Sequence, residues 1–107
     1  MEKFVLVPFT EAVDSDSIKI VTYIEIPFYT LQFVKKGESF SASYQASIGI
    51  KDKRGQDLAH QVWTDSIKVS SYTDTKSAVK NRKHFTIFTM SVGKKYEVVG
   101  ELQDSDT

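Results

Sequence analysis

The clearest pattern in the chain is an alternation of apolar and polar positions. From Phe40 to Ile50 every second residue is apolar or small, and mostly polar residues stand between them. The stretch 18–26 alternates in the same way. A period of two is that of a β-strand with one buried face, and a helix would not bury these positions on one side. The predicted inward residues are Phe40, Ala42, Tyr44, Ala46, Ile48 and Ile50 in the first strand and Ile18, Ile20, Thr22, Ile24 and Ile26 in the second.

Shorter β-rich runs occupy much of the remaining chain, and polar segments with glycine or proline separate them. The run 58–71 changes phase. Leu58, His60 and Val62 share one parity, whereas Trp63, Ile67 and Val69 share the other. A bulge near Val62 and Trp63 would reconcile the two, because one extra residue turns the strand over. The other predicted strands are 3–8, 29–34, 85–90 and 96–102, and the predicted loops and turns are 10–17, 35–38, 72–83 and 93–95.

These elements predict an all-β fold of about six or seven strands without a helix. We expect an antiparallel immunoglobulin-like β-sandwich, and a small closed barrel is the alternative. The 107 residues suit a single domain, 1–107, with one core. Met1 leads directly into a strand-like segment without a signal peptide. We therefore expect either a cytoplasmic protein or a domain excised from a longer exported chain.

Composition excludes several classes of function. The 14 basic and 14 acidic residues cancel, so the chain lacks the overall positive field that favours nucleic-acid binding. The chain has no cysteine, which excludes disulfides, zinc–thiolate sites and cysteine nucleophiles. No apolar run approaches the ~20 residues that span a bilayer. We predict neither nucleic-acid binding nor membrane insertion.

The sequence offers few candidates for catalysis or metal binding. There is no nucleophile elbow and no glycine-rich phosphate loop. His60 and His84 are the only histidines, and both stand at positions of solvent-facing parity, where we interpret them as surface or half-buried residues. Zinc needs three or four ligands, so we predict no metal site from them. We accordingly predict no catalytic residue, no cofactor and no enzyme activity.

Two acidic pairs and one charged turn have simpler interpretations than ligand sites. Asp14 with Asp16 and Asp104 with Asp106 each form an Asp-Ser-Asp. Calcium takes six to eight oxygens, so these pairs are interpreted as solvated chain segments, and calcium binding is left open. The segment 52–55, Asp-Lys-Arg-Gly, has the composition of a hairpin turn. The basic segment 76–84 lacks the interleaved aromatics of nucleic-acid readers and is interpreted as a solubilising loop.

Four aromatic residues do not all fit the predicted inward faces: Tyr23, Tyr29, Phe33 and Tyr72. We interpret them as candidate contacts for a protein partner or a sugar. They would equally suit a cover over the open end of the core or a contact with a neighbouring domain. Trp63 is expected to lie in the core, as tryptophan does between the sheets of immunoglobulin-like domains.

The order of several blocks resembles a known family. These blocks are the Tyr-Ile-Glu-Ile-Pro-Phe segment around Pro27, the alternating strand from Phe40, the 51–55 turn, Trp63, and Gly-Lys-Lys-Tyr from Gly93. Together they are similar to the β-rich domain of GWxTD-domain proteins, which are large exported proteins of Bacteroidetes-type bacteria. The resemblance covers about residues 18–106. The segment 62–65 is not the motif that names the family, because it lacks the glycine and the spacer.

The resemblance implies a β-sandwich module of an extracytoplasmic protein, periplasmic or on the cell surface, with no catalytic residues. We expect a non-enzymatic interaction or structural module. Its expected partners are other domains of the parent protein or another envelope protein, and a homodimer is the default form of self-association. A carbohydrate-binding module using exposed aromatic residues is the alternative. An enzyme is a third hypothesis, which would need a cleft joining a histidine to carboxylates.

Overall fold

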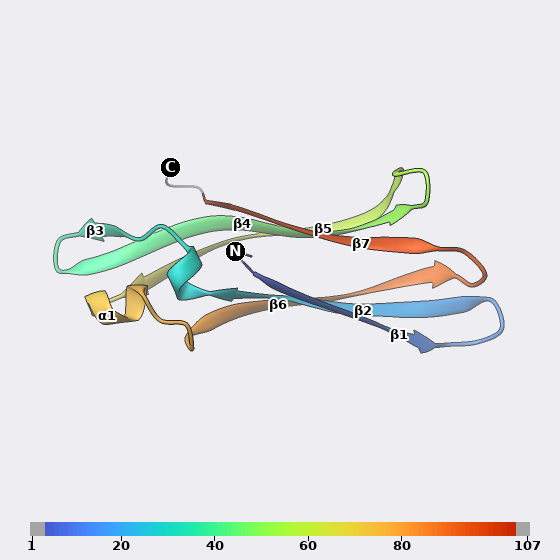
Figure 1. Ribbon diagram of the computed structural model, residues 1–107, viewed down its shortest axis with the longest axis horizontal. Coiled ribbons are helices and arrows are strands. Elements are labelled where there is room, and N and C mark those ends of the chain that lie inside the picture. Colours follow the sequence, from blue (N-terminus) through green and yellow to red (C-terminus); the bar gives the residue numbers. More distant parts are fainter. Residues whose placement is uncertain (1–3, 105–107) are drawn as a thin grey trace.

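The computed structural model describes residues 4–104, which form seven strands and two short helical turns (Figure 1). β4 and β2 coincide with the two clearest alternating stretches of the sequence. In chain order the elements are β1 (Val5–Ala12), β2 (Ser17–Pro27), the 3-10 turn η1 (Phe28–Thr30), β3 (Val34–Lys36), β4 (Ser39–Asp52), β5 (Asp57–Val69), α1 (Tyr72–Thr75), β6 (Asn81–Ser91) and β7 (Tyr96–Asp104).

The strands form two antiparallel sheets. Sheet A has the order β1-β2-β6. In sheet B, β4 is central, with β5 on one side and both β3 and β7 along the other. The sheets lie one over the other along the 55 Å length of the molecule (Figure 1). The fold is therefore the predicted immunoglobulin-like β-sandwich. A closed barrel is ruled out for the described residues, because no strand ladder joins the two sheets.

The core lies between the two inner faces and confirms most of the predicted inward residues. β2 contributes alternate residues from Ile20 to Ile26, and β4 contributes alternate residues from Ala42 to Ile50. Side chains such as Ile24, Tyr44 and Ile48 are fully buried. Burying an aliphatic side chain of this size stabilises the fold by about 1.5–3 kcal/mol. Phe40 and Ile18, at the strand ends, are only partly buried.

The predicted bulge near Val62 and Trp63 is wrong. The β4–β5 register runs without interruption from Phe40 opposite Val69 to Ile50 opposite Ala59, and it shifts only at Lys51. Trp63 lies opposite Ala46 on the inner face and packs against the core as expected. The change of phase in the sequence has another cause: Leu58 and Val62 are apolar residues on the outer face, where both are substantially exposed.

Three other segments differ from their predicted structure. β1 continues past Pro8 to Ala12, because Pro8 lies on an edge strand, where a missing N–H group is tolerated. The predicted strand 29–34 is instead the turn η1 followed by β3. The predicted loop 72–83 contains α1, where the Thr75 hydroxyl donates to the Tyr72 carbonyl at 2.6 Å, and the start of β6.

Candidate functional site

The outer face of sheet A is unusually apolar for a surface that solvent reaches. The register places Tyr23 of β2 between Val7 of β1 and Phe85 of β6, and the next row on this face is formed in the same way. Phe9 is 51% exposed, Phe85 57% and Ile87 48%. We name this surface the apolar face. It comprises Val5, Val7, Phe9, Val21, Tyr23, Phe85 and Ile87, of which Val21, on the central strand, is itself buried beneath its neighbours.

Charged residues border the apolar face at both ends. At one end Glu25 and Lys83 are paired across β2 and β6, and at the other end Glu11 and Lys19 are paired across β1 and β2. The Lys83 ammonium lies 5.6 Å from the centre of the Tyr23 ring, which is a cation–π distance. A contiguous apolar patch with a charged rim is typical of a protein interaction surface.

The four predicted contact residues do not form one site. Tyr23 belongs to the apolar face. Phe33 and Tyr72 lie at one end of the sandwich, where with Phe40 they line a hollow of about 370 Å³. The rings of Phe40 and Tyr72 meet edge to face at 5.8 Å. Tyr29 lies on η1, where its N–H group donates to the Ser77 carbonyl, and its side chain is partly exposed.

Sequence reasoning missed Phe9, Phe85 and Ile87 as surface residues. The parity of β6 decides which of its residues face solvent, and the prediction that His84 faces solvent was wrong. His84 lies opposite Ile24 and points inward, so Phe85 and Ile87 point outward. Phe85 on that outer face is as apolar as the core residues. Hydrophobicity alone therefore suggested that Phe85 points inward and His84 outward.

The inward-facing His84 belongs to a polar cluster in the interior. Its Nε2 lies 2.6 Å from the buried Tyr44 hydroxyl, which lies 3.3 Å from Oδ2 of Asp65. The imidazole also stacks on the Trp63 ring, with centroids 5.0 Å apart. Both contacts of the hydroxyl are satisfied when the His84 Nε2–H donates to the Tyr44 oxygen and the Tyr44 O–H donates to Asp65.

Burial dominates the electrostatics of this cluster. It raises the pKa of the Tyr44 phenol, and the nearby Asp65 carboxylate raises that pKa further. Burial also lowers the pKa of His84 from its ordinary value of 6.5, although Asp65 partly opposes this effect. A phenol with a raised pKa stays protonated at neutral pH. The cluster is thus a satisfied interior network of hydrogen bonds, with no activated nucleophile.

Metal-binding groupings are absent from the part of the chain that the structure describes. No three histidine, aspartate or glutamate residues there are placed to hold an ion. Oδ1 of Asp14 accepts hydrogen bonds from the N–H groups of Asp16 and Ser17, both at 2.8 Å, and these bonds lower the pKa of Asp14. Asp104 accepts from the Gln32 N–H at 3.2 Å. Asp106 lies outside the described residues.

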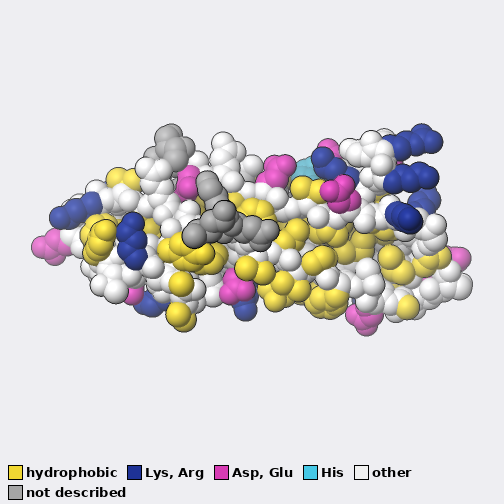
Figure 2. Space-filling model, viewed as in Figure 1, with side chains coloured by type: hydrophobic (Ala, Val, Ile, Leu, Met, Phe, Trp, Pro, Cys, Tyr) yellow, Lys and Arg dark blue, Asp and Glu magenta, His cyan; other side chains and the backbone are white. Residues whose placement is uncertain are grey.

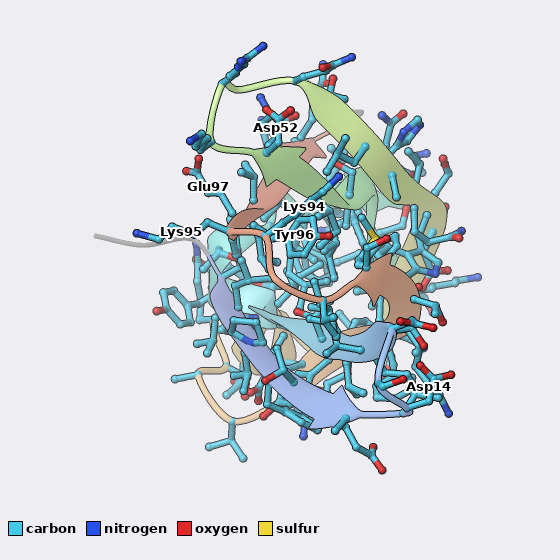
Figure 3. All side chains as sticks on the ribbon, turned by 90° about the vertical axis from the view of Figure 1, so that its right-hand side faces the viewer. Asp14, Asp52, Lys94, Lys95, Tyr96 and Glu97 are labelled. Carbon is cyan, nitrogen blue, oxygen red and sulfur yellow. The ribbon has the colours of Figure 1, made fainter. Side chains whose placement is uncertain are left out.

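The segment 52–55 is a hairpin turn between β4 and β5, as predicted. Oδ1 of Asp52 accepts hydrogen bonds from the N–H groups of Arg54 and Gln56, and Gly55 takes a positive φ of 83°. The β6–β7 turn lies beside it, so that Lys53, Arg54, Lys94 and Lys95 border one hollow of about 580 Å³. Figure 3 looks onto this end of the molecule.

No helix among the described residues is long and apolar enough to cross a membrane. His60 is exposed on the outer face of sheet B, as predicted. There it borders a shallow hollow of about 310 Å³ with Gln45, Ser47 and Glu101.

Comparison with known proteins defines the class of fold. No family model and no curated protein matches the chain. Among solved structures, the chain is similar to a proposed β-galactosidase from Bacteroides fragilis, with a TM-score of 0.65 and 14% sequence identity. The match covers 95% of this chain and 14% of that protein. This likeness shows the β-sandwich fold, which forms a small part of a much longer chain in that protein.

Proposed function

We propose that this chain is a non-enzymatic interaction module, which packs through the apolar face against another domain of a longer protein or against a separate protein. The observation that carries this proposal is that Phe9 of β1 and Phe85 and Ile87 of β6, on the same outer face of sheet A, each expose about half of their surface. Covering these side chains would remove apolar area from water and so favour association.

The setting that we propose is an exported bacterial protein, periplasmic or on the cell surface. The blocks similar to GWxTD-domain proteins support this proposal. The use of the same fold as a small part of a long Bacteroides protein is compatible with it. In such a setting the charged rim around the apolar face would fix the orientation of the neighbouring domain.

The proposal is tested by hydroxyl-radical footprinting of the protein in its natural assembly and of the isolated 107-residue chain. Phe9, Tyr23 and Phe85 should be oxidised several-fold less in the assembly. Tyr72, which is 59% exposed at the end of the sandwich, serves as the internal control and should be labelled equally in both samples. Equal labelling of the apolar face in both samples would refute the proposal.

A carbohydrate-binding module is the second candidate, and the end hollow supports it. Tyr72 and Phe33 present aromatic rings there beside the polar side chains of Gln32, Lys35 and Lys76. Stacking of a sugar on Tyr72 is the chemistry that such a hollow allows. Screening against a glycan array, with Tyr72→Ala as the matched variant, tests it. Binding that survives Tyr72→Ala, or no binding to any glycan, would exclude this hollow as a sugar site.

A further inference from the structure

The sandwich is open along one side, between the edge strands β1 and β7. A groove of about 400 Å³ lies there. It is lined mainly by apolar side chains, with Lys94 of the β6–β7 turn at its end: Pro8, Phe9 and Thr10 of β1, Ile18 and Ile20 of β2, Lys94, and Tyr96 and Val98 of β7. Ile20 is itself a core residue, so the groove reaches the hydrophobic interior. We name this cavity the β1–β7 groove. Figure 2 shows apolar side chains along this side of the molecule.

The groove is closed farther along β7 and open at its start. At Gly100 an added Cβ would lie 3.0 Å from the Phe4 ring and 3.4 Å from the Leu6 side chain, so β1 covers β7 closely at that point. At Tyr96 and Val98 the described part of β1 leaves the groove uncovered. The open length therefore corresponds to the first half of β7.

β7 also has a free hydrogen-bonding edge. One side pairs with β4 without a register shift from Tyr96 to Asp104. Within residues 4–104 no strand lies on its other side. Of the devices that commonly protect an edge, β7 lacks proline and a bulge and has only the charged side chains of Glu97 and Glu101. β1, the facing edge, carries Pro8. An uncovered apolar groove beside a strand edge that has free backbone groups is the combination that strand addition uses.

We propose that β7 binds an extended peptide segment of another protein, which adds to sheet B as a further strand and inserts alternate side chains into the β1–β7 groove. The inserted residues would be apolar, matching Ile18, Ile20 and Val98. Because successive residues of a strand point to opposite faces, the intervening residues of the peptide would lie on the outer face beside Glu97 and Glu101.

Charge determines which peptide fits. Glu97 and Glu101 point to the outer face, and Figure 3 shows Glu97 directed away from the interior into which Tyr96 points. No ion pair engages either glutamate among the described residues, and Lys51, the register partner of Glu97, lies 3.8 Å from Asp57. The partner segment should therefore carry lysine or arginine at alternate positions.

The same charges disfavour pairing of β7 with a second copy of itself. In an antiparallel pair centred on Gly100, Glu101 of one copy would lie opposite Val99 of the other and diagonal to its Glu101. Like charges at neighbouring cross-strand positions are destabilising. This site shares Phe9 with the apolar face but lies along β7 of sheet B, and its occupant is a basic extended segment of a different protein.

The test uses two synthetic nine-residue peptides with blocked ends, one alternating valine with lysine and the other alternating valine with glutamate. The lysine peptide should bind the wild-type chain at least about tenfold more tightly, since two cross-strand charge pairs change sign between the peptides. It should also slow hydrogen exchange of the β7 amides. Titration calorimetry and exchange mass spectrometry measure these effects.

The double variant Glu97→Lys with Glu101→Lys should reverse the preference and favour the glutamate peptide. The matched control, Glu11→Lys with Glu25→Lys, makes the same change of net charge on the rim of sheet A and should leave the preference unaltered. Equal binding of both peptides, or the same reversal in the control variant, would overturn the proposal. If the chain associates with itself through β7 in the absence of peptide, the occupant of the edge is a second copy of this chain and not a segment of a different protein.

Discussion

The two sheets of the sandwich differ in the chemistry of their outer faces. In sheet B the outward positions of β4 are serine, glutamine, glycine and lysine from Ser41 to Lys51. On β5 the polar His60 and Thr64 alternate there with the apolar Leu58 and Val62. In sheet A the corresponding surface is the apolar face. Both sheets bury their inner faces in the same core. The demands of folding therefore explain the inner faces and the polar outer face, but not the apolar one.

This contrast distinguishes apolar residues that stabilise the fold from those available to a partner. A solvated antiparallel sheet usually alternates between a buried apolar face and an exposed polar face, as the central strand β4 of sheet B does. Sheet A departs from this alternation on all of its strands. A departure that extends across β1, β2 and β6 is a property of the surface as a whole, and the proposed association through the apolar face would account for it.

The largest expected effect is a difference in stability between a substitution on the inner face of sheet A and one on its outer face. Ile24→Ala should lower the free energy of unfolding by about 2–5 kcal/mol, because Ile24 is fully buried and the change leaves a cavity. Ile87→Ala on the outer face should cost at most about 1 kcal/mol, because much of that side chain already contacts water. Urea unfolding measures both. Equal losses would mean that the apolar face belongs to the core of the isolated chain.

Much of the fold followed from the sequence because β2 and β4 bury one face completely. Buried residues stand at every second position from Ile20 to Ile26 and from Ala42 to Ile50, so the strand type, most of the inward residues and the sandwich class were all predictable. β5 and β6 were harder for a common physical reason. Each has apolar side chains on both faces, and periodicity does not determine which face is inward when Phe85 and Phe88 are equally hydrophobic.

The site was less predictable than the fold. Tyr23 was identified because an aromatic residue stood between the inward positions of β2. Phe9 and Phe85 were missed because their exposure depends on the register of three strands and on where sheet B ends, and neither property is local in sequence. The interior cluster of Tyr44, Asp65 and His84 was missed for the same reason: its members come from three different strands.

The second prediction concerns a polar group inside the sandwich. Tyr44→Phe should lower the free energy of unfolding by about 1–3 kcal/mol, because His84 and Asp65 would lose their shared partner in a partly buried site. Tyr23→Phe removes a hydroxyl from the apolar face and should change stability by at most about 0.5 kcal/mol. Thermal unfolding of the two variants compares them. A neutral Tyr44→Phe would show that the interior network adds no stability.

The third prediction is the pH dependence that His84 imposes. Its pKa is lower in the folded state than the ordinary 6.5, so the unfolded chain binds more protons just below that pH. Stability should therefore fall as the pH drops from 7 through 6.5 toward the lowered pKa, and it should level off below it. The charged groups around His84 act in opposite directions, since Asp65 raises its pKa and Arg82 lowers it.

Urea midpoints between pH 7 and pH 5.5 measure this effect. His84→Gln should flatten the profile over that range, and His60→Gln, which removes an exposed imidazole from the outer face of sheet B, is the matched control. A profile that flattens only in the control would assign the titration to the surface of sheet B and would contradict the inward placement of His84.

The fourth prediction concerns variants that make the outer face of sheet A more polar and the outer face of sheet B more apolar. Phe85→Thr with Ile87→Thr should change stability by about 1 kcal/mol or less but reduce binding of a hydrophobic dye and any self-association. The reverse exchange, Gln45→Phe with Ser47→Ile on β4, should increase both on sheet B. Dye fluorescence and light-scattering mass report the outcome. Unchanged dye binding in the first variant would show that the apolar face presents no usable hydrophobic surface.

The smallest expected effect lies at the hairpin between β4 and β5. Lys53→Ala with Arg54→Ala should leave the free energy of unfolding within about 0.5 kcal/mol of wild type, because neither side chain holds the turn. The turn depends on the Asp52 carboxylate, which accepts two backbone N–H groups, and on Gly55 with its positive φ. Asp52→Ala should therefore cost more than the double variant, in the range of about 0.5–2 kcal/mol for a lost cap. If the double variant lowers the free energy of unfolding more than Asp52→Ala does, the charges of Lys53 and Arg54 stabilise this end of sheet B. The polar surface there would then contribute to folding and would not only face solvent.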